Sequence, residues 1–430
     1  MRATQIHNTN NIKQFKAKAL AWAQQFNDVV WLDSNHNGQR YASYDAVLAV
    51  DAFTSIKTDY HSAFDNLKEY QTLANDWIFG YLTYDLKNDV EALTSKNYDG
   101  LDFADLYFFQ PKKLFLFKGN TIELKYLMMV DDEMENDLKT IKNMVLNKEE
   151  PTKTPVKIRL RISKDEYFKK IEKILWHIHR GDIYETNFCQ EFYAENTKIE
   201  PLNIYGRLNK ISNTPFAAFL KHGNNYLLSA SPERYLKKEG NTIISQPIKG
   251  TAKRADNTGE DEKLKKELEL SPKERSENIM IVDLVRNDLS KTAIKGSVNV
   301  EELCKVYTFD QVHQMISTVT AQIRPETHPV DVIKTTFPMG SMTGAPKISA
   351  MKIIEDLEET KRGLYSGAVG YFEPCGNFDF NVVIRSILYN KTKQYVSYSV
   401  GGAITAQSNP VGEYEECVLK AKALRQVLER

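Results

Sequence analysis

The sequence predicts an α+β protein with substantial antiparallel sheet. Short runs rich in β-branched and aromatic residues alternate irregularly with runs of helical period, and the regular βαβ repetition of a parallel sheet is absent. With 430 residues, 42% of them hydrophobic, the chain is long enough to bury one large core or two moderate ones. These observations favour a globular fold rather than a disordered or repetitive chain.

Residues 1–150 form the first predicted region, of mixed α and β character. The runs 28–32 and 113–117 are predicted strands because they are short, apolar and bounded by Asn, Asp and Gly. The charged, Pro-containing stretch 147–155 interrupts the apolar pattern and is the predicted linker. We therefore place a boundary there, with a second region over residues 156–430.

A helix is predicted to open the second region. Ser163 and Glu166 have capping-box spacing, apolar residues follow at helical period, and Gly181 offers a C-terminal stop. Beyond this helix the predicted strands are 183–192, 226–230, 242–245, 368–372, 380–388 and 395–400.

Charge and composition exclude several classes of function. Lys plus Arg (57) equals Asp plus Glu (57), so the chain has no bulk attraction for nucleic acid or for an anionic membrane. The four cysteines show no CxxC spacing, which excludes the common zinc and disulfide patterns and fits a reducing compartment. No apolar stretch approaches the roughly 18 residues of a membrane helix, and no signal peptide is visible, so we expect a cytoplasmic protein.

Two pairs of glutamates carry the first chemical signal. Glu274 and Glu277, and later Glu413 and Glu416, are spaced i, i+3, so each pair shares one helix face. Ser271 and the proline after it predict an N-cap and a first helical turn before the first pair. Two such helix starts facing each other would form an all-oxygen Mg²⁺ site. Capping and the helix dipole alone explain the same spacing.

Lys249 lies in a tight Pro/Gly turn directly after an apolar strand. A lysine that is partly desolvated, or near a metal cation, can act as a nucleophile. The alternative is an ordinary solvated turn lysine.

Three segments rich in small residues, 338–347, 365–371 and 400–403, are candidate carboxylate-binding loops. Glycines let backbone N–H groups approach a carboxylate closely, and Thr343 can add a hydroxyl donor. Each segment can equally be a turn or a close-packed strand. Neither a dinucleotide fingerprint nor a P-loop is present, so no nucleotide site is predicted.

Three single residues are further candidates. Arg385 lies inside an apolar run and needs an anionic partner, either a substrate carboxylate or an internal Asp or Glu. Glu233 follows a strand, where it is either an acid catalyst or a surface turn residue. His313 is either a proton carrier or a satisfied structural histidine.

Seven sequence motifs, in their order along the chain, resemble those of the chorismate-utilising enzymes, which include the anthranilate, aminodeoxychorismate, isochorismate and salicylate synthases. The resemblance covers about residues 163–428. It implies an anthranilate synthase component I-like fold, with two layers of large antiparallel sheet flanked by helices and a site in the cleft between them. Seven ordered matches carry it: SPERY (231–235), PIKGT (247–251), ERSENIMIVDLVRNDL (274–289), GSMTGAPK (340–347), YSGAVGYF (365–372), FNVVIRS (380–386) and EYEECVLKAKAL (413–424).

The resemblance implies a role for each matching position. Glu277 and Glu416 correspond to magnesium ligands, with Glu274 and Glu413 in or just behind the same shell. The metal would neutralise the ring carboxylate of chorismate.

The remaining matches concern the organic part of the substrate. The enolpyruvyl carboxylate is expected to be held by Arg385, Tyr365 and the backbone of Gly401 and Gly402, and the ring to be lined by Gly250 and Thr251.

Glu233 resembles the general acid for the departing 4-hydroxyl. Lys249 marks the aminodeoxychorismate branch, because anthranilate synthases typically carry Ala there. By this resemblance Lys249 attacks C2, and ammonia then adds at C4.

The chain departs from the family pattern at several positions. Glu185 stands where aminating enzymes usually have Gln and isochorismate formers have Lys, which argues against isochorismate formation. Ala403 replaces a usual glycine and Gln407 a usual Asp. The segment 30–34 lacks the Leu-Leu-Glu-Ser pattern of tryptophan-inhibited relatives, so no tryptophan feedback is expected.

No glutaminase module is visible, so a separate glutamine amidotransferase subunit is the expected source of ammonia. No pyridoxal-dependent lyase region is visible either, so p-aminobenzoate, the folate precursor, would need another protein. Two alternatives remain: an anthranilate synthase component I, and a non-catalytic subunit that only activates a glutaminase.

Overall fold

The structure is a computed structural model that describes residues 1–37, 40–146, 155–309 and 312–429. The predicted linker, and with it the boundary at residue 150, lies outside the described residues apart from Pro155. The helices are α1 (Ile12–Ala23), α2 (Ala63–Ala74), α3 (Lys87–Val90), α4 (Met134–Asn143), α5 (Lys164–Arg180), α6 (Pro201–Ser212), α7 (Thr258–Leu270), α8 (Pro272–Ser290), α9 (Pro329–Thr336), α10 (Lys347–Leu357) and α11 (Pro410–Glu429), with short 3₁₀ turns η1 (Tyr84–Leu86), η2 (Asp131–Glu133) and η3 (Gly340–Met342).

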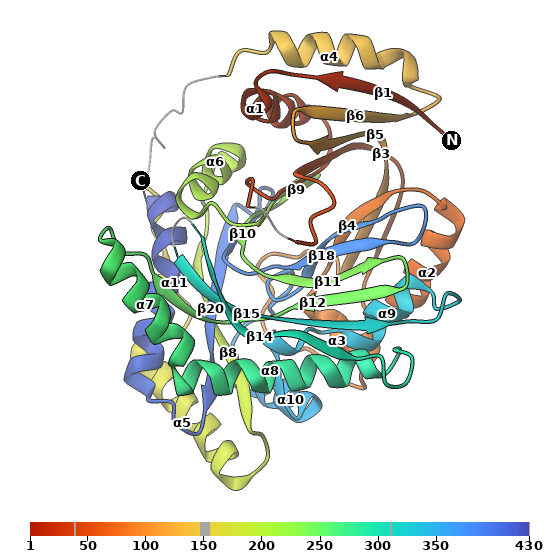
Figure 1. The fold of residues 1–430 in the computed structure, drawn as a ribbon. Helices are drawn as coiled ribbons and strands as arrows, with labels where there is room; N and C mark the ends of the chain where they lie inside the picture. Colours follow the sequence, from red (N-terminus) through yellow and green to blue (C-terminus); the bar gives the residue numbers. More distant parts are fainter. Residues whose placement is uncertain (38–39, 147–154, 310–311, 430) are drawn as a thin grey trace.

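The strands of the described chain join into one continuous antiparallel network (Figure 1). They are β1 (Arg2–Asn8), β2 (Asp28–Asp33), β3 (Ala46–Thr58), β4 (Ile78–Leu82), β5 (Leu106–Lys118), β6 (Thr121–Leu127), β7 (Arg159–Leu160), β8 (Glu185–Ala194), β9 (Phe216–His222), β10 (Asn225–Ser231), β11 (Arg234–Glu239), β12 (Thr242–Gln246), β13 (Ile248–Lys253), β14 (Asn299–Thr308), β15 (Val312–Gln322), β16 (Gly344–Ala345), β17 (Ala368–Phe372), β18 (Phe378–Val382), β19 (Ser386–Asn390) and β20 (Tyr395–Thr405).

Two long strands, β3 and β5, are shared by two layers. One layer continues from them through β2, β9, β10, β19, β20 and β8, and the other through β4, β17, β18, β11, β12 and β15. A register shift in β3 between Ala52 and Thr54 marks the change of layer, because a bulge bends the strand. The α+β class and its antiparallel character are thus confirmed.

Alternation along the strands supplies the two main cores. Val30 belongs to the cluster that joins strands of both layers with α2, α8 and α9, whereas its neighbour Val29 belongs to the cluster beneath α1, α4, α6 and α11. Successive side chains of a strand point to opposite faces, so one strand serves both cores. Helices therefore flank the layers on the outside (Figure 1).

Local signals in the sequence located several elements correctly. The capping box of Ser163 and Glu166 is present, and α5 ends at Gly181 with a φ of 88°. Ser271 caps α8 by accepting a hydrogen bond from the backbone N–H of Glu274.

The cysteines are free thiols. None of the described helices is long and apolar enough to cross a membrane.

One predicted strand is wrong. The run 380–388 is not continuous: β18 ends at Val382 and β19 begins at Ser386. Arg385 adopts a φ of 50°, a left-handed conformation that interrupts strand pairing. Arg385 therefore lies in a connection between strands and not in a strand interior.

Candidate active site

The four predicted metal-ligand glutamates lie around one ammonium group. Glu274 and Glu277 are in the first turns of α8, and Glu413 and Glu416 in those of α11. Burial acts to lower the pKa of Lys273, but these four carboxylates outweigh that effect and raise it. The two helix starts are therefore within electrostatic range of each other, as the spacing predicted.

The four carboxylates differ in their surroundings. Glu277 is buried, its Oε1 has no hydrogen-bond partner among the described residues, and burial raises its pKa to about 7. Glu413 is buried and accepts a hydrogen bond from the Ser408 hydroxyl at 2.7 Å. Glu416 is more exposed and pairs with Lys420 at 2.7 Å. Glu277 Oε1 is thus a buried oxygen without a hydrogen bond, and the Lys273 ammonium lies 3.9 Å from it.

Donor chemistry at this place fits Mg²⁺, which prefers carboxylate oxygens and leaves several positions to water and substrate. The orphaned Oε1 of Glu277 is the observation that agrees with such a ligand. Among the described residues, however, no three acidic, His or Cys side chains lie close enough together to form a complete metal site. Magnesium binding by Glu274, Glu277, Glu413 and Glu416 therefore remains a prediction.

Lys249 lies among the acidic side chains of the site. It is half-buried on β13, and its ammonium makes no hydrogen bond or ion pair within the described chain. Burial raises the pKa of Glu185 on β8, Glu277 on α8 and Glu233 in the β10–β11 connection, and the charge of Lys249 opposes each rise. Lys249 also acts, together with Lys420 and Lys273, to lower the pKa of Glu416 on α11. Lys249 is therefore not an isolated surface lysine.

The predicted tight turn at Lys249 is wrong, because Lys249 and Gly250 both lie within strand β13, whose register shifts between Ile248 and Thr251. Gly250 allows this irregularity. Its φ is 88°, and a Cβ placed there would lie 3.0 Å from Oε2 of Glu274. Only glycine combines this backbone conformation with such a close approach. Thr251, the next residue, is exposed on β13. This irregular part of β13 is thus packed directly against the acidic start of α8.

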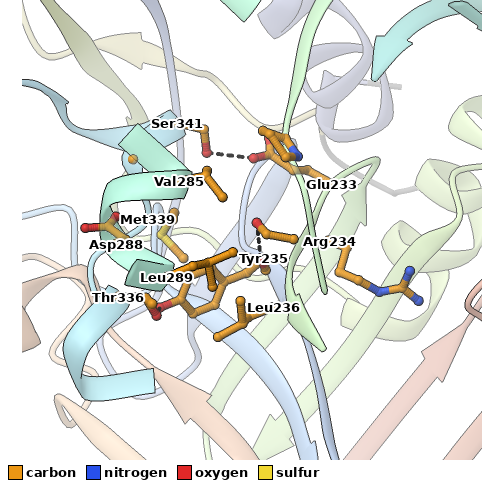
Figure 2. A pocket seen from close by; sticks show the side chains of 13 residues that line it. Glu233, Arg234, Tyr235, Leu236, Val285, Asp288, Leu289, Thr336, Met339 and Ser341 are labelled. Carbon is orange, nitrogen blue, oxygen red and sulfur yellow. Dashed lines mark hydrogen bonds between the residues drawn. The ribbon is translucent and has the colours of Figure 1, made fainter. Parts of the chain in front are cut away.

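Glu233 is a buried acid and not the surface turn residue that the sequence left open. Its side chain is held by the Ser341 hydroxyl, which donates to Oε1 at 2.6 Å (Figure 2). Burial raises the pKa of Glu233 to about 7, although Ser341, Lys249 and Arg385 oppose the rise. A carboxyl group that is partly protonated at neutral pH is suited to general acid catalysis.

A small cavity lies beside Glu233 and explains the low polarity of its surroundings. Apolar side chains from α8 and β11, and Met339 just before η3, form much of its wall, and Ser341 and Glu233 lie at one edge (Figure 2). Neither Lys249 nor the glutamates of the helix starts line this cavity. We therefore assign it to the environment of Glu233 and not to the whole substrate site.

Arg385 is available for a ligand. Burial lowers the pKa of its guanidinium, while the Glu233 carboxylate acts in the opposite direction. The guanidinium makes no hydrogen bond or ion pair within the described chain, and the internal carboxylate that acts on it, through its charge alone, is Glu233. A guanidinium whose N–H donors are unused is suited to bind the carboxylate of a substrate.

The glycine-rich strand β20 and Tyr365 contribute the remaining predicted substrate-binding residues. Gly401 pairs with Cys189, and a Cβ there would come within 2.2 Å of the Phe188 carbonyl oxygen, so Gly401 allows close strand packing. At Gly402 a Cβ would lie 3.3 Å from Glu413 Oε2, which places this residue beside the acidic start of α11. Tyr365 is buried, with its hydroxyl 3.6 Å from the Cys189 sulfur.

Residues 27–426 match the family model described as chorismate binding enzyme. The chain belongs to this family. The resemblance suggested by the seven motifs is thereby confirmed.

Relatives of this chorismate-binding chain carry two kinds of name. An anthranilate synthase component I-like protein of Synechocystis sp. is 34% identical over 366 residues, which cover 85% of this chain and 75% of that protein. Aminodeoxychorismate synthase component 1 of Salmonella typhimurium is 38% identical over 283 residues, or 65% of this chain. The match spans 62% of the Salmonella protein, which is less than two thirds of its length.

A solved structure confirms the fold of the chorismate-binding chain. Anthranilate synthase component I from Streptococcus pneumoniae superposes with a TM-score of 0.76 at 25% identity, and the match covers 91% of this chain and 94% of that one. The anthranilate synthase component I-like architecture expected from the motifs is therefore present.

Two predicted site residues of the chorismate-binding chain are engaged elsewhere. His313 is buried on β15, with Nε2 3.0 Å from Asp261 and Nδ1 2.9 Å from Thr308, so both ring nitrogens are occupied. This favours the structural interpretation of His313. Thr343 is fully buried, and its hydroxyl donates to backbone carbonyls of Met339 and Gly340. The single hydroxyl proton of Thr343 is therefore not free for a ligand.

Sequence reasoning missed Lys273 and Ser341. Lys273 lies directly before the matched stretch that begins at Glu274, and Ser341 lies inside GSMTGAPK. Neither has a local pattern that distinguishes it from a surface residue, because Ser341 acts on the distant Glu233 and Lys273 interacts with Glu413 and Glu416 as well as with its neighbours Glu274 and Glu277. Glu185 was noted as a departure from the family pattern but was not predicted as a site residue.

Proposed function

We propose that this chorismate-binding enzyme is an aminodeoxychorismate synthase component I, which converts chorismate and ammonia to 4-amino-4-deoxychorismate. The observation that carries the proposal is Lys249, whose unpaired ammonium lies among the carboxylates of the site. A lysine in this environment can act as a nucleophile that bonds covalently to the substrate. The elimination chemistry of the anthranilate branch needs no such amine.

Substrate binding would use the residues of the two layers. The free guanidinium of Arg385 offers a planar grip on the enolpyruvyl carboxylate, with Tyr365, Gly401 and Gly402 forming the adjacent wall. Mg²⁺, when bound by Glu277 and Glu416 with Glu274 and Glu413 behind them, would supply the positive charge that neutralises the ring carboxylate. Gly250 and Thr251 would then line the ring.

The first chemical step joins Lys249 to the ring. The Lys249 ammonium first gives a proton to a neighbouring carboxylate of the site; the resulting amine forms a bond to C2, the double bonds shift, and the C4–O bond breaks. Glu233 donates its proton to the departing oxygen, so that water leaves. The pKa of about 7 supports this role, because a usable fraction of Glu233 is protonated at neutral pH.

The second step reverses this bond pattern. Ammonia forms a bond to C4, the double bonds shift back, and the C2–N bond breaks, which returns Lys249 as a neutral amine. The sum is chorismate plus ammonium giving the aminated product, itself in ammonium form, plus water. A glutamine amidotransferase partner would supply the ammonia, and the product would serve p-aminobenzoate and folate formation.

The second candidate is an anthranilate synthase component I, which the Synechocystis relative's name favours. The two activities differ in the product: anthranilate plus pyruvate, or 4-amino-4-deoxychorismate without pyruvate release. Incubation of the purified chain with chorismate, Mg²⁺ and an ammonium salt, followed by chromatography, separates them. A pure chain without any turnover of chorismate would instead indicate a non-catalytic activating subunit.

Lys249→Ala tests the covalent step, because it removes a nucleophile held at high effective concentration. We expect loss of most C4 amination and an adduct on Lys249 in quenched wild-type enzyme, detected by mass spectrometry. Lys253→Ala, an exposed lysine on the same strand, is the matched control and should leave the rate unchanged. Full retention of aminodeoxychorismate formation by Lys249→Ala would refute the mechanism.

A further inference from the structure

Glu185 is a buried carboxylate that the proposed reaction does not use. It is the first residue of β8, only 2% of it is exposed, and its Oε2 has no hydrogen-bond partner in the described chain. A buried carboxylate oxygen without a donor is unfavourable, and native structures usually supply one. The missing donor is therefore expected to come from a group that binds at this oxygen.

The backbone places Glu185 on the wall of the active site. Alternation along β8 puts Glu185, Asn187 and Cys189 on one face. The Asn187 amide donates to the backbone oxygen of Ser341 at 3.3 Å, and Ser341 in turn holds Glu233. The side chains on this face of β8 therefore extend from Glu185 to the vicinity of Glu233, the proposed general acid.

Two charged groups face Glu185 from the elements around it. Lys249 of β13 lowers its pKa, which burial raises, and Glu185 itself raises the pKa of Glu277 on α8. On either side β8 pairs with β16 and β20, and a Cβ at Gly344 would lie 2.3 Å from the Glu185 backbone oxygen. The backbone at Glu185 is thus closely packed, and its carboxylate is within electrostatic range of the nucleophile and of Glu277 in the predicted metal site.

We propose that Glu185 binds the ammonium ion that supplies the new amino group. An ammonium ion is small, carries one positive charge and has four N–H donors, so it satisfies the unpaired oxygen and offsets its charge. The carboxylates of chorismate would be repelled from the same place. This inference rests on the proposed amination at C4.

The bound ammonium must lose a proton before its nitrogen can form the C4–N bond. The Glu185 carboxylate accepts that proton. Over the cycle, the proton taken from ammonium replaces the one that Glu233 gives to the departing hydroxyl. Atoms and charges then balance over the cycle without a further reactant. A glutamine at position 185 can accept a hydrogen bond from ammonia but cannot attract the ammonium cation.

The test is steady-state kinetics of Glu185→Gln in the full chain, with ammonium chloride as the nitrogen source. We expect the KM for total ammonium at neutral pH to rise by about tenfold or more, as for the loss of one charge-assisted hydrogen bond. The KM for chorismate should stay within about twofold, because Arg385 and the metal site are untouched. Glu195→Gln removes the same charge just beyond the exposed end of β8 and is the matched control.

The pH dependence adds a readout that a structural role would not produce. In the Gln variant, the KM for total ammonium should fall about tenfold per pH unit as neutral ammonia becomes available, whereas the wild-type value should change less. Thermal melting is expected to show an intact fold, since the variant removes an uncompensated buried charge.

Three outcomes would overturn the inference. An unchanged KM for ammonium in the Gln variant would show that Glu185 does not hold the nitrogen source. A changed Mg²⁺ requirement with an unchanged ammonium KM would assign Glu185 to the metal site. Wild-type enzyme that forms no aminated product would remove the proposed function, and this inference with it.

Discussion

Ser341→Ala isolates the one hydrogen bond that holds the general acid. The Ser341 hydroxyl donates to Glu233 at 2.6 Å and thereby stabilises the ionised carboxylate, which opposes the effect of burial. A hydrogen bond to a charged group contributes roughly 1.5–3 kcal/mol. One pH unit corresponds to about 1.4 kcal/mol, so its loss should raise the pKa of Glu233 by about one to two units.

The sign of the effect is unusual for a variant that removes a supporting contact. Because Glu233 acts in its protonated form, a higher pKa moves the alkaline limb of the kcat/KM profile from about 7 to higher pH. The assay is chorismate turnover from pH 5.5 to 9.5 in wild type, Ser341→Ala and Ser245→Ala. Ser245 lines the same cavity but donates to the Tyr235 carbonyl, so its variant should leave the limb in place.

A limb that stays where it is in Ser341→Ala, or moves to lower pH, would refute the assignment of Glu233 as the acid that limits the rate. Equal shifts in both serine variants would indicate a general change of the cavity instead. Either result would leave the chorismate-binding family assignment untouched.

Three further predictions concern the charged groups of the site. Arg385→Lys should raise the KM for chorismate by about tenfold, because a point charge cannot reproduce a two-donor grip; an unchanged KM would show that the guanidinium does not touch the substrate. Excess EDTA, or Glu277→Ala, should abolish turnover with little loss of thermal stability, and wild-type rates in EDTA would exclude the metal. Because the folded state raises the pKa of Glu233 from 4.5 to about 7, its contribution to stability is full below pH 4.5 and is lost as the pH rises to about 7. Wild type should therefore lose up to roughly 3 kcal/mol more of its unfolding free energy across that window than Glu233→Gln in urea titrations, and parallel pH profiles would contradict this.

Features with a local cause were accessible from the sequence. The α5 helix could be bounded because its capping serine and its terminal glycine act within one turn of the chain. Strand β17 coincides with the predicted run 368–372, because a short apolar segment between turns has few other conformations. The glutamate pairs were found because an i, i+3 spacing is a property of one helix.

Features with a non-local cause were not accessible. The break at Arg385 depends on a single left-handed residue that apolar periodicity cannot reveal. The burial of Glu233 and Glu185 depends on packing against segments distant in sequence, so both looked like ordinary polar residues at strand ends. Likewise, the contact between His313 and Asp261 of α7, which favours a structural role for this histidine, depends on the fold and cannot be inferred from the local sequence.

The pairings of β2 with β9 and of β4 with β17 have a practical consequence for anyone who wishes to study residues 156–430 alone. A fragment of residues 156–430 would leave β9 and β17 with bare edges, and their unpaired backbone groups are templates for adhesion between copies. We expect such a fragment to aggregate when it is produced by itself. Co-production with residues 1–146 should keep it in solution, because the missing strands are then available to cover both edges.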